Sequence, residues 1–256
     1  MSSKLTKSYP GRLYMDWLSK PVIGKADGER VPVTEAADVI RDEVLVEALG
    51  RAGFTHLLPV QMTLLQAMSG VSPDGRPRDY AVSAPTGSGK TLAYIIPILR
   101  RLRSRKVVRL RALVIVPTRL LVGQVKAAFE SLIQHLPKGR SSPLTVGTAM
   151  GQSSSLAAEQ RRLFDAQEGK AAVDILVATP GRLVEHLRFT PGFDLRDLEV
   201  LVVDEADRLL DQSYQDWLQL VHSATHPEDR VILPFGASGI EGPAWRRSRP
   251  LHTLLF

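Results

Sequence analysis

Short apolar runs alternate along the chain with longer segments in which apolar residues recur every three or four positions. The run at 112–116 is apolar at every position, which is typical of a strand buried on both faces of a sheet. Similar runs predict further strands at 80–83, 144–149, 173–178, 198–203 and 251–256. The helical spacing predicts helices at 36–49, 60–68, 90–103, 120–136, 155–167 and 181–186, the third of them kinked at Pro97.

This alternation of strands and helices predicts an α/β fold with a mostly parallel sheet that is covered by helices on both faces. Ligands of such folds bind beyond the carboxyl ends of the strands, so the residues after each strand are the first functional candidates. We divide the chain into an irregular arm at 1–34, an α/β domain at 35–221, and a final segment at 222–256 with a loop and the start of a further strand.

The segment at 84–91 follows the first predicted α/β strand and reads Ala-Pro-Thr-Gly-Ser-Gly-Lys-Thr. Backbone N–H groups of such a loop can point at an anion, and the start of the next helix adds the positive end of its dipole. Lys90 is placed to reach the β- and γ-phosphates, and the Thr91 hydroxyl to ligate Mg²⁺. Ala84 stands where the usual pattern has glycine. The segment predicts a nucleoside triphosphate site, the simpler alternative being a turn that only connects a strand to a helix.

Two adjacent acids, Asp204 and Glu205, follow the apolar run at 198–203. At the carboxyl end of a strand, Asp204 can hold Mg²⁺ directly or through water, and Glu205 can orient or deprotonate an attacking water. The alternative is an acidic turn that caps the next helix. The phosphate loop earlier in the chain favours the interpretation as a metal and water site.

The composition narrows the class of protein. The chain has 256 residues, 44% of them hydrophobic, which is enough for a sizeable core, and it has no cysteine, which excludes disulfides and thiolate metal sites. Its apolar runs are shorter than the roughly 20 residues of a membrane span, and its N-terminus lacks the apolar core of a secretory signal. The net charge of +6 favours polyanionic partners. We expect a monomeric intracellular protein with no membrane partner.

From 53 to 217 the sequence resembles the DEAD-box RNA helicases in the order and spacing of several motifs. The segment at 84–91 resembles the first ATPase motif of that family, and Asp204-Glu205-Ala206-Asp207 is its name-giving tetrapeptide. Gly53-Phe54, Pro59 and Gln61 resemble its adenine-sensing motif. The segments that resemble its RNA-backbone motifs are Pro117-Thr118-Arg119, Gly151-Gln152 and Thr179-Pro180-Gly181-Arg182.

The resemblance implies a RecA-like P-loop domain that uses ATP and Mg²⁺ and takes part in local separation of short RNA duplexes. The catalytic residues that it implies are Lys90, Asp204 and Glu205, and the metal ligands are Thr91 and Asp204. The implied nucleotide contacts are Phe54, Gln61, Ala84, Thr86, Gly87, Ser88, Gly89, Lys90, Thr91 and Asp207. The implied RNA contacts are Pro117, Thr118, Arg119, Gly151, Thr179, Pro180, Gly181 and Arg182.

Several of these roles also follow from side-chain chemistry. The Gln61 amide can both donate and accept, as recognition of an adenine edge requires; alternatively, it is a surface residue that begins a helix. Arg119 and Arg182 each follow a strand and a turn with proline, so both are expected at the edge of the phosphate loop. With Thr118, Thr179 and the Gly181 N–H they predict a row that contacts phosphates without reading bases, although either arginine alone could be a solvated charge.

The sequence also departs from the family. Leu120 replaces the usual glutamate after the first RNA motif, Gly151-Gln152 replaces a glycine pair, and the aromatic residue expected ahead of Gln61 falls near Val44. Pro59 stands closer to Gln61 than is usual. That spacing, with Trp17-Leu18 upstream and the sequence that continues the acidic tetrapeptide from Asp204 to Trp217, looks most like the nucleolar subgroup that assembles the large ribosomal subunit. We therefore expect a nuclear, nucleolar location, with ribosomal RNA and ribosome-assembly proteins as partners.

The tripeptide Ser223-Ala224-Thr225 matches the motif that couples hydrolysis to unwinding in the family. We reject it, because Leu218 and Val221 place it on a helix that continues from the acidic segment, whereas the coupling motif should follow the next strand, expected at 251–256. We therefore expect the chain to end before a second RecA-like domain with its arginine fingers, to bind nucleotide and RNA, and to hydrolyse ATP poorly without unwinding. The last strand is expected to be an unpaired edge or an incomplete member of the sheet, and the chain to have low stability.

The densest positive run lies between the third predicted helix and the strand at 112–116. Its members are Arg100, Arg101, Arg103, Arg105, Lys106, Arg109 and Arg111. We expect it at the opposite edge of the sheet from the RNA row, as a solvated loop, the alternative being an extra contact to ribosomal RNA or to a partner.

Three functions therefore remain open. The first is an RNA-dependent ATPase of the DEAD-box kind, represented by its ATP-binding half, and the second is a nucleotide- and RNA-binding module without turnover. The third, a P-loop ATPase unrelated to nucleic acid, is disfavoured because it would give Arg119 and Arg182 no role.

Overall fold

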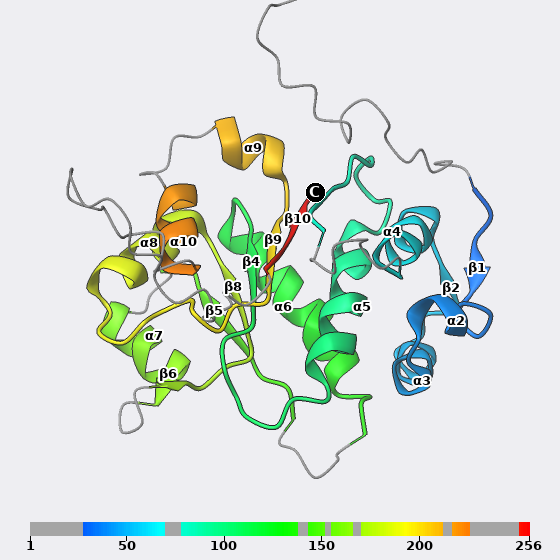
Figure 1. The fold of residues 1–256 in the computed structure, drawn as a ribbon, viewed down its shortest axis with the longest axis horizontal. Coiled ribbons are helices and arrows are strands. Elements are labelled where there is room, and N and C mark those ends of the chain that lie inside the picture. Colours follow the sequence, from blue (N-terminus) through cyan, green and yellow to red (C-terminus); the bar gives the residue numbers. More distant parts are fainter. Residues whose placement is uncertain are drawn as a thin grey trace, which may run out of the picture.

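The computed structural model describes residues 28–69, 78–137, 143–151, 155–165, 170–211, 217–225 and 251–256. Its centre is a 6-stranded sheet in the order β3-β10-β9-β4-β8-β5, parallel throughout (Figure 1). The strands are β3 (Tyr80–Ala81), β4 (Ala112–Ile115), β5 (Val146–Ala149), β8 (Ile175–Ala178), β9 (Val200–Val203) and β10 (His252–Leu255). Each lies within a segment that the sequence predicts as a strand, and the predicted parallel α/β fold is confirmed.

Consecutive side chains of the central strands enter two different cores. On β4, Ala112 and Val114 join a first cluster, whereas Leu113 and Ile115 join a second cluster on the other face. The first cluster is completed by α2 (Ala37–Ile40), α3 (Glu43–Arg51), α4 (Pro59–Ser69), α5 (Lys90–Leu102) and α6 (Arg119–Ile133). The second is completed by α7 (Leu156–Leu163), α8 (Pro180–Phe189), α9 (Ala206–Asp211) and α10 (Trp217–Thr225). Burial on both faces explains why these strands are continuous apolar runs.

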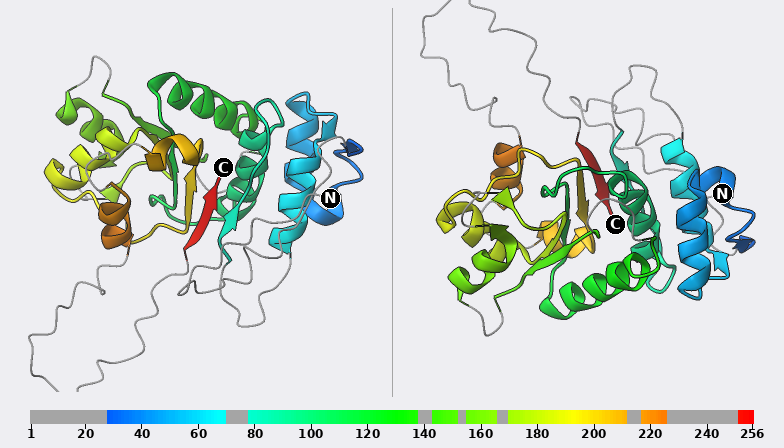
Figure 2. Two further views of the ribbon diagram at one scale, coloured as in Figure 1. Left: turned by 90° about the horizontal axis from the view of Figure 1, so that it is seen from above. Right: turned by 90° about the horizontal axis from the view of Figure 1, so that it is seen from below.

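Two short antiparallel pairs flank the main sheet, β1 (Val31–Pro32) with β2 (His56–Leu57), and β6 (Phe164–Asp165) with β7 (Lys170–Ala171). Figure 2 shows the N-terminal helices, in blue and cyan, on the far side of α5 from the sheet. None of the described helices combines the length and the apolar character that a membrane crossing requires.

The predicted helix at 36–49 is in fact two helices. Arg41 adopts a left-handed backbone with φ of 54°, which ends α2, and the Asp42 side chain accepts a hydrogen bond from the Leu45 N–H at 3.1 Å, which caps α3. Asp42 also pairs with Arg103 at the end of α5. The prediction of one continuous helix was wrong. The break between α2 and α3 involves the pairing of Asp42 with Arg103, which is 61 residues away in the sequence.

Two other helix boundaries also differ. The helix predicted at 155–167 ends at Leu163, where the chain enters β6, and the short helix predicted at 181–186 extends from Pro180 to Phe189. Ser223, Ala224 and Thr225 end α10, so their rejection as a coupling motif agrees with the structure. The arm around Trp17, residue Gln152 and the loop at 226–250 lie outside the described residues.

The strand β10 is not an unpaired edge, so that alternative of the prediction was wrong. It lies between β9 and β3 and pairs with both, and Leu254 is fully buried in the first cluster. Among the described strands, β3 pairs with β10 alone, so β10 connects β3 to the rest of the sheet. The expectation of low stability rested on an unpaired edge and loses that basis.

The basic run is only partly a solvated loop: Arg101, Arg103 and Lys106 are exposed, but most of its arginines are paired with acids. Arg101 and Arg111 both pair with Glu199, at 2.6 and 3.2 Å, ahead of β9. Arg105 pairs with Asp174 ahead of β8, and both side chains are almost fully buried. Arg109 pairs with Asp197 at 3.5 Å. These arginines neutralise the acids at the amino ends of the strands, on the opposite edge of the sheet from the phosphate loop, as the sequence predicted for their location.

A buried leucine at the end of the chain tests the pairing of β10. Leu254→Ala removes a side chain with 0% exposure and is expected to lower the free energy of unfolding by about 2–5 kcal/mol. Leu120→Ala, at a position that is 72% exposed, is the matched control and should change it by less than about 0.5 kcal/mol. Urea unfolding followed by circular dichroism gives both values, and equal effects would contradict the position of β10.

Candidate functional site

The predicted functional segments meet at one edge of the sheet because all of its strands are parallel. The phosphate loop follows β3, Asp204 follows β9, Thr118 follows β4, Thr179 follows β8 and Gly151 follows β5. The carboxyl ends of the strands therefore carry every motif that the sequence singled out after a strand.

The phosphate loop adopts a backbone that glycine allows. Gly87 and Gly89 have φ of 77° and 85°, and Gly89 immediately precedes α5. The Lys90 ammonium folds back over the loop and donates to the carbonyl oxygens of Ala84 at 2.7 Å and Pro85 at 3.2 Å. The Ser88 hydroxyl oxygen is buried and has no hydrogen-bond partner among the described residues. A buried hydroxyl without a partner, beside an ammonium at a helix start, fits the oxygens of a bound phosphate.

Gln61 holds α4 against this loop. Its Oε1 accepts from the Leu58 N–H at 2.7 Å, and its Nε2 donates to the Gly89 carbonyl oxygen at 3.0 Å. With 2% exposure, the amide lies beside the loop, and both of its ends are bound to backbone. Phe54 lies elsewhere, half-buried against the first cluster after α3. The structure thus brings Gln61 to the loop, and no contact of the described residues does so for Phe54.

Asp204 is the buried acid of the site, with 9% exposure. Its Oδ1 accepts from the Glu205 N–H at 3.0 Å, and its Oδ2 accepts from the Tyr94 hydroxyl at 3.1 Å. Burial raises the pKa of Asp204, and the Tyr94 hydroxyl, the Glu205 N–H and the charge of Lys90 oppose that rise. Lys90 and Asp204 follow neighbouring parts of the same sheet edge, after β3 and β9.

Glu205 has a left-handed backbone with φ of 54°, and its carboxylate is 39% exposed, 3.5 Å from Arg208. It therefore remains accessible beside Asp204. Asp207 is exposed in the first turn of α9, and no contact of the described residues links it to the loop. Thr91 lies in the first turn of α5, three residues before Tyr94 and on the same face of the helix. Burial, followed by the charge of Asp204, raises the pKa of Tyr94, so this hydroxyl keeps its proton and can donate.

Residues of the predicted RNA row lie at the starts of two helices, α6 and α8. Thr118 caps α6 by accepting from the Leu121 N–H at 3.3 Å, and the side chain of Arg119 beside it is exposed. Thr179 and Pro180 begin α8, and the Gly181 Cα faces open space. Pro117 is half-buried between β4 and Thr118. These residues lie at the predicted edge with their helix N-termini turned toward it.

Arg182 is already paired in this structure. Its guanidinium bonds to Glu159 at 2.7 Å and to Glu185, and the side chain is 12% exposed. Glu159, with 2% exposure, also accepts from the Gly151 N–H at 3.0 Å and lies 3.1 Å from His186 Nε2. One buried carboxylate thus joins the ends of β5, α7 and α8.

Sequence reasoning missed three residues of this edge, Tyr94, Glu159 and His186. Burial lowers the pKa of His186 despite the nearby Glu159 carboxylate, so its neutral ring can donate from Nε2 to Glu159 and accept at Nδ1 from Thr190 at 2.8 Å. Tyr94 follows Lys90 by one helical turn, and that spacing was a usable signal. Glu159 reads as an ordinary surface acid of a helix, and no signal in the sequence marks it.

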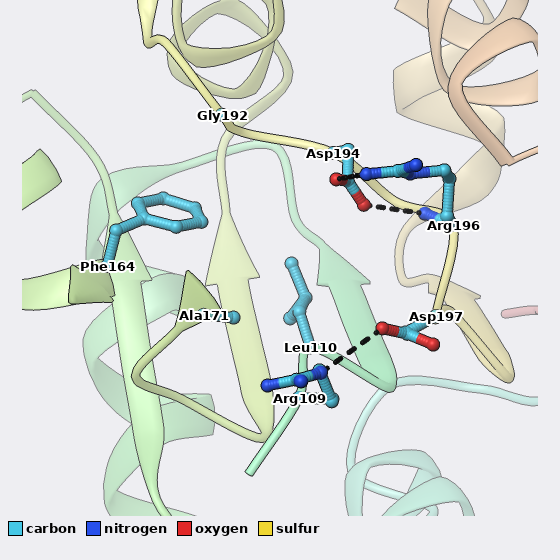
Figure 3. Close-up of a pocket in the computed structure, with 8 residues that line it drawn as sticks. All are labelled: Arg109, Leu110, Phe164, Ala171, Gly192, Asp194, Arg196 and Asp197. Atoms are coloured by element: carbon cyan, nitrogen blue, oxygen red, sulfur yellow. Dashed lines mark hydrogen bonds and ion pairs between the residues drawn. The ribbon is translucent and has the colours of Figure 1, made fainter. Parts of the chain in front are cut away.

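A cavity of about 350 Å³ lies away from this edge, at the amino ends of β4 and β9 (Figure 3). Leu110, Phe164 and Ala171 form its apolar wall. Its charged groups are paired with one another, Arg196 with Asp194 at 2.7 Å and Arg109 with Asp197 at 3.5 Å, so it offers no excess charge to a phosphate. The cavity is separate from the phosphate-loop site.

Comparison with known proteins decides the family. Residues 59–241 match the family model of the DEAD/DEAH box helicases. The chain belongs to this family. The resemblance seen in the sequence is thereby confirmed, and so is the RecA-like fold: the crystal structure of the yeast DEAD-box splicing factor Prp28 matches with a TM-score of 0.67 and 26% identity, over 91% of this chain and 48% of that one.

Two curated relatives have the words "ATP-dependent RNA helicase" in their names. DEAD-box ATP-dependent RNA helicase 1 of Arabidopsis thaliana is 43% identical over 205 residues, which are 74% of this chain and 38% of that protein. ATP-dependent RNA helicase DDX51 of Homo sapiens is 40% identical over 226 residues, 83% of this chain and 33% of that protein. The chain thus spans about a third of the length of these relatives.

Two glycines of the loop allow a matched test. A Cβ at Gly89 would collide with the Gln61 side chain and lie 2.8 Å from Leu58 Cδ1, whereas a Cβ at Gly87 would meet nothing within 4 Å. Gly87→Ala is expected to cost about 1–2 kcal/mol of stability from its positive φ alone. Gly89→Ala should cost more and separate Gln61 from the loop. Thermal melts with and without an ATP analogue measure both effects, and equal losses would argue against the Gln61 contact.

Glu159 and Glu185 both bond to Arg182, but only Glu159 is buried. Glu159→Gln leaves Arg182 and the Gly151 N–H without their charged acceptor and is expected to cost about 3 kcal/mol of stability. Glu185→Gln, at a side chain that is 50% exposed, should cost less than about 1 kcal/mol. Urea unfolding at pH 7 compares the two, and a larger loss for Glu185→Gln would refute the central role of Glu159.

Proposed function

We propose that this chain binds ATP with Mg²⁺ at the phosphate loop and the RNA backbone at the neighbouring strand ends, as the nucleotide-binding part of an ATP-dependent RNA helicase. The observation that carries the proposal is the meeting of the buried, unpartnered Ser88 hydroxyl, Lys90 and Asp204 at one sheet edge. Membership of the DEAD/DEAH box family supports it.

On the nucleotide side, each group has a distinct role. Lys90 would exchange the carbonyl oxygens of Ala84 and Pro85 for β- and γ-phosphate oxygens, and Ser88 would gain the partner that it lacks. When bound, Mg²⁺ would neutralise phosphate charge, with Thr91 and Asp204 as its protein ligands. Glu205, exposed beside Asp204, would orient or deprotonate the attacking water. Gln61 would recognise the adenine edge, for which its amide has to exchange at least one of its two backbone bonds.

On the RNA side, the row is formed by two helix starts and the exposed guanidinium of Arg119. Thr118 and Arg119 begin α6, and Thr179, Pro180 and Gly181 begin α8. Helix N-termini and an exposed guanidinium suit phosphates, and such contacts carry no base information. Arg182 and Gly151 would support this row through Glu159, with Arg182 reaching RNA only by leaving a carboxylate.

The biological setting that we propose is ribosomal RNA processing during assembly of the large ribosomal subunit, in the nucleolus. It rests on two subgroup features of the sequence. One is the spacing between Pro59 and Gln61, and the other is the sequence that continues the acidic tetrapeptide to Trp217. Because a backbone-contacting row does not read sequence, the choice of RNA would depend on assembly proteins or on parts of the protein outside this row.

The test is binding of a fluorescent single-stranded RNA, followed by anisotropy, with Mg²⁺ and a non-hydrolysable ATP analogue. Lys90→Ala is expected to weaken analogue binding by about ten- to a hundredfold, because it removes charged hydrogen bonds to phosphate. Arg119→Ala should weaken RNA binding at unchanged analogue affinity and reduce the salt slope by about one.

Arg188→Ala is the matched control, because Arg188 is also exposed but lies at the opposite end of α8 from Thr179. It should leave RNA binding unchanged. Equal effects of Arg119→Ala and Arg188→Ala would contradict the row, and analogue binding that survives Lys90→Ala would contradict the nucleotide site. Analogue and RNA binding without any ATP turnover would favour the module that binds without catalysis.

A further inference from the structure

Tyr94 places a hydroxyl group inside the apolar core, directly behind the nucleotide site. The residue has 0% exposure and lies in the middle of the first cluster, where the residues on either side of it in α5, Ala93 and Ile95, are buried and apolar. A phenylalanine would fill the same volume without a polar atom to satisfy. The hydroxyl therefore calls for an explanation beyond packing.

The position of Tyr94 on α5 supplies that explanation. Residues three and four apart lie on one face of a helix, so Tyr94 stands one turn behind Lys90 and Thr91. Its hydroxyl donates to Asp204 Oδ2 at 3.1 Å. It thus contacts one of the two side chains that would hold Mg²⁺ and lies one helical turn behind the other, Thr91.

The second bond to Asp204 shows what the hydroxyl does. The Glu205 N–H holds Oδ1 at 3.0 Å, and Tyr94 holds Oδ2. With both bonds the plane of the carboxylate is fixed, whereas with one alone it can rotate about Cβ–Cγ. Each carboxylate oxygen has a further lone pair, so both bonds leave room for a metal ion or its water.

The ring of Tyr94 is itself held in place. Its centroid is 5.2 Å from that of Phe256 in an edge-to-face contact with an interplanar angle of 62°. The backbone oxygen of Phe256 accepts from the Ala206 N–H at 2.7 Å, so the residue that packs on the ring also anchors the segment after Asp204. Packing thus fixes the hydroxyl independently of the hydrogen bond that it makes.

We propose that Tyr94 is a positioning residue that orients the Asp204 carboxylate for the Mg²⁺ ion of the bound nucleotide. The inference rests on the proposed function and deepens it. The hydroxyl touches neither the nucleotide nor the attacking water and acts only through Asp204. Groups of this kind, behind the ligands of a metal, affect metal affinity by about ten- to a hundredfold.

The test is a Mg²⁺ titration of fluorescent ATP-analogue binding to wild type and to Tyr94→Phe, with a parallel measurement in EDTA. Tyr94→Phe keeps the ring and its contacts, so the fold should persist. The Mg²⁺ concentration at half-effect is expected to rise by about tenfold, at unchanged affinity in EDTA. Tyr80→Phe is the matched control, because it removes a hydroxyl that donates to the Ala67 carbonyl oxygen at 3.1 Å outside the site, and it should change neither value.

A double-mutant comparison separates positioning from packing. In an Asp204→Asn background, Tyr94→Phe should have no further effect on the Mg²⁺ titration, because its route of action is already lost. An additional loss there, or a Tyr94→Phe protein with a lower melting temperature and an unchanged Mg²⁺ response, would overturn the proposal. So would tighter Mg²⁺ binding by Tyr94→Phe.

The Mg²⁺ titration separates a failure of the proposed function from a failure of the role of Tyr94. If wild type binds the analogue with no dependence on Mg²⁺, the metal part of the proposed function and the role of Tyr94 both fail. If wild type depends on Mg²⁺ and Tyr94→Phe matches it at every concentration, only the role of Tyr94 fails.

Discussion

The pairing of β10 between β3 and β9 is the constraint on which the nucleotide site depends. The phosphate loop is attached to β3 and Asp204 to β9, and neighbouring strands lie about 4.8 Å apart, so one intervening strand sets roughly 10 Å between the two strand ends. That distance leaves space for phosphates between Lys90 and the acid. The hydrogen bond from the Ala206 N–H to the Phe256 oxygen then fixes the acidic segment to the end of the same strand.

The molecule separates its charges between the two edges of the sheet. At the amino ends, the arginines between α5 and β4 are matched with acids, as in the buried pair of Arg105 with Asp174. At the carboxyl ends, Lys90 bonds to two carbonyl oxygens within the described part of the chain, and Arg119 is exposed. A net charge of +6 therefore says little about where an anion binds, because many of the cations are structural. At the carboxyl ends, the accessible cations lie beside helix starts, whereas Arg188 and others are exposed elsewhere.

The sequence allowed prediction of what depends on local pattern. The strands appear as apolar runs because both faces are covered, and the phosphate loop and the acids after β9 are recognisable from their neighbours in the chain. What it could not predict depends on distant partners. The break at Arg41 depends on Asp42 meeting Arg103, and the pairing of β10 on β3, far earlier in the chain. The roles of Tyr94 and Glu159 likewise depend on groups that only the fold brings to them.

The buried carboxylate of Glu159 has a consequence for how the family can diverge. It accepts from Arg182, His186 and the Gly151 N–H at once. Replacing the side chain of Glu159, Arg182 or His186 alone therefore leaves an unmatched polar group in the interior. Neutral drift at these positions is blocked one substitution at a time. Glu159, Arg182 and His186 are therefore expected to be inherited, or exchanged, together as one unit.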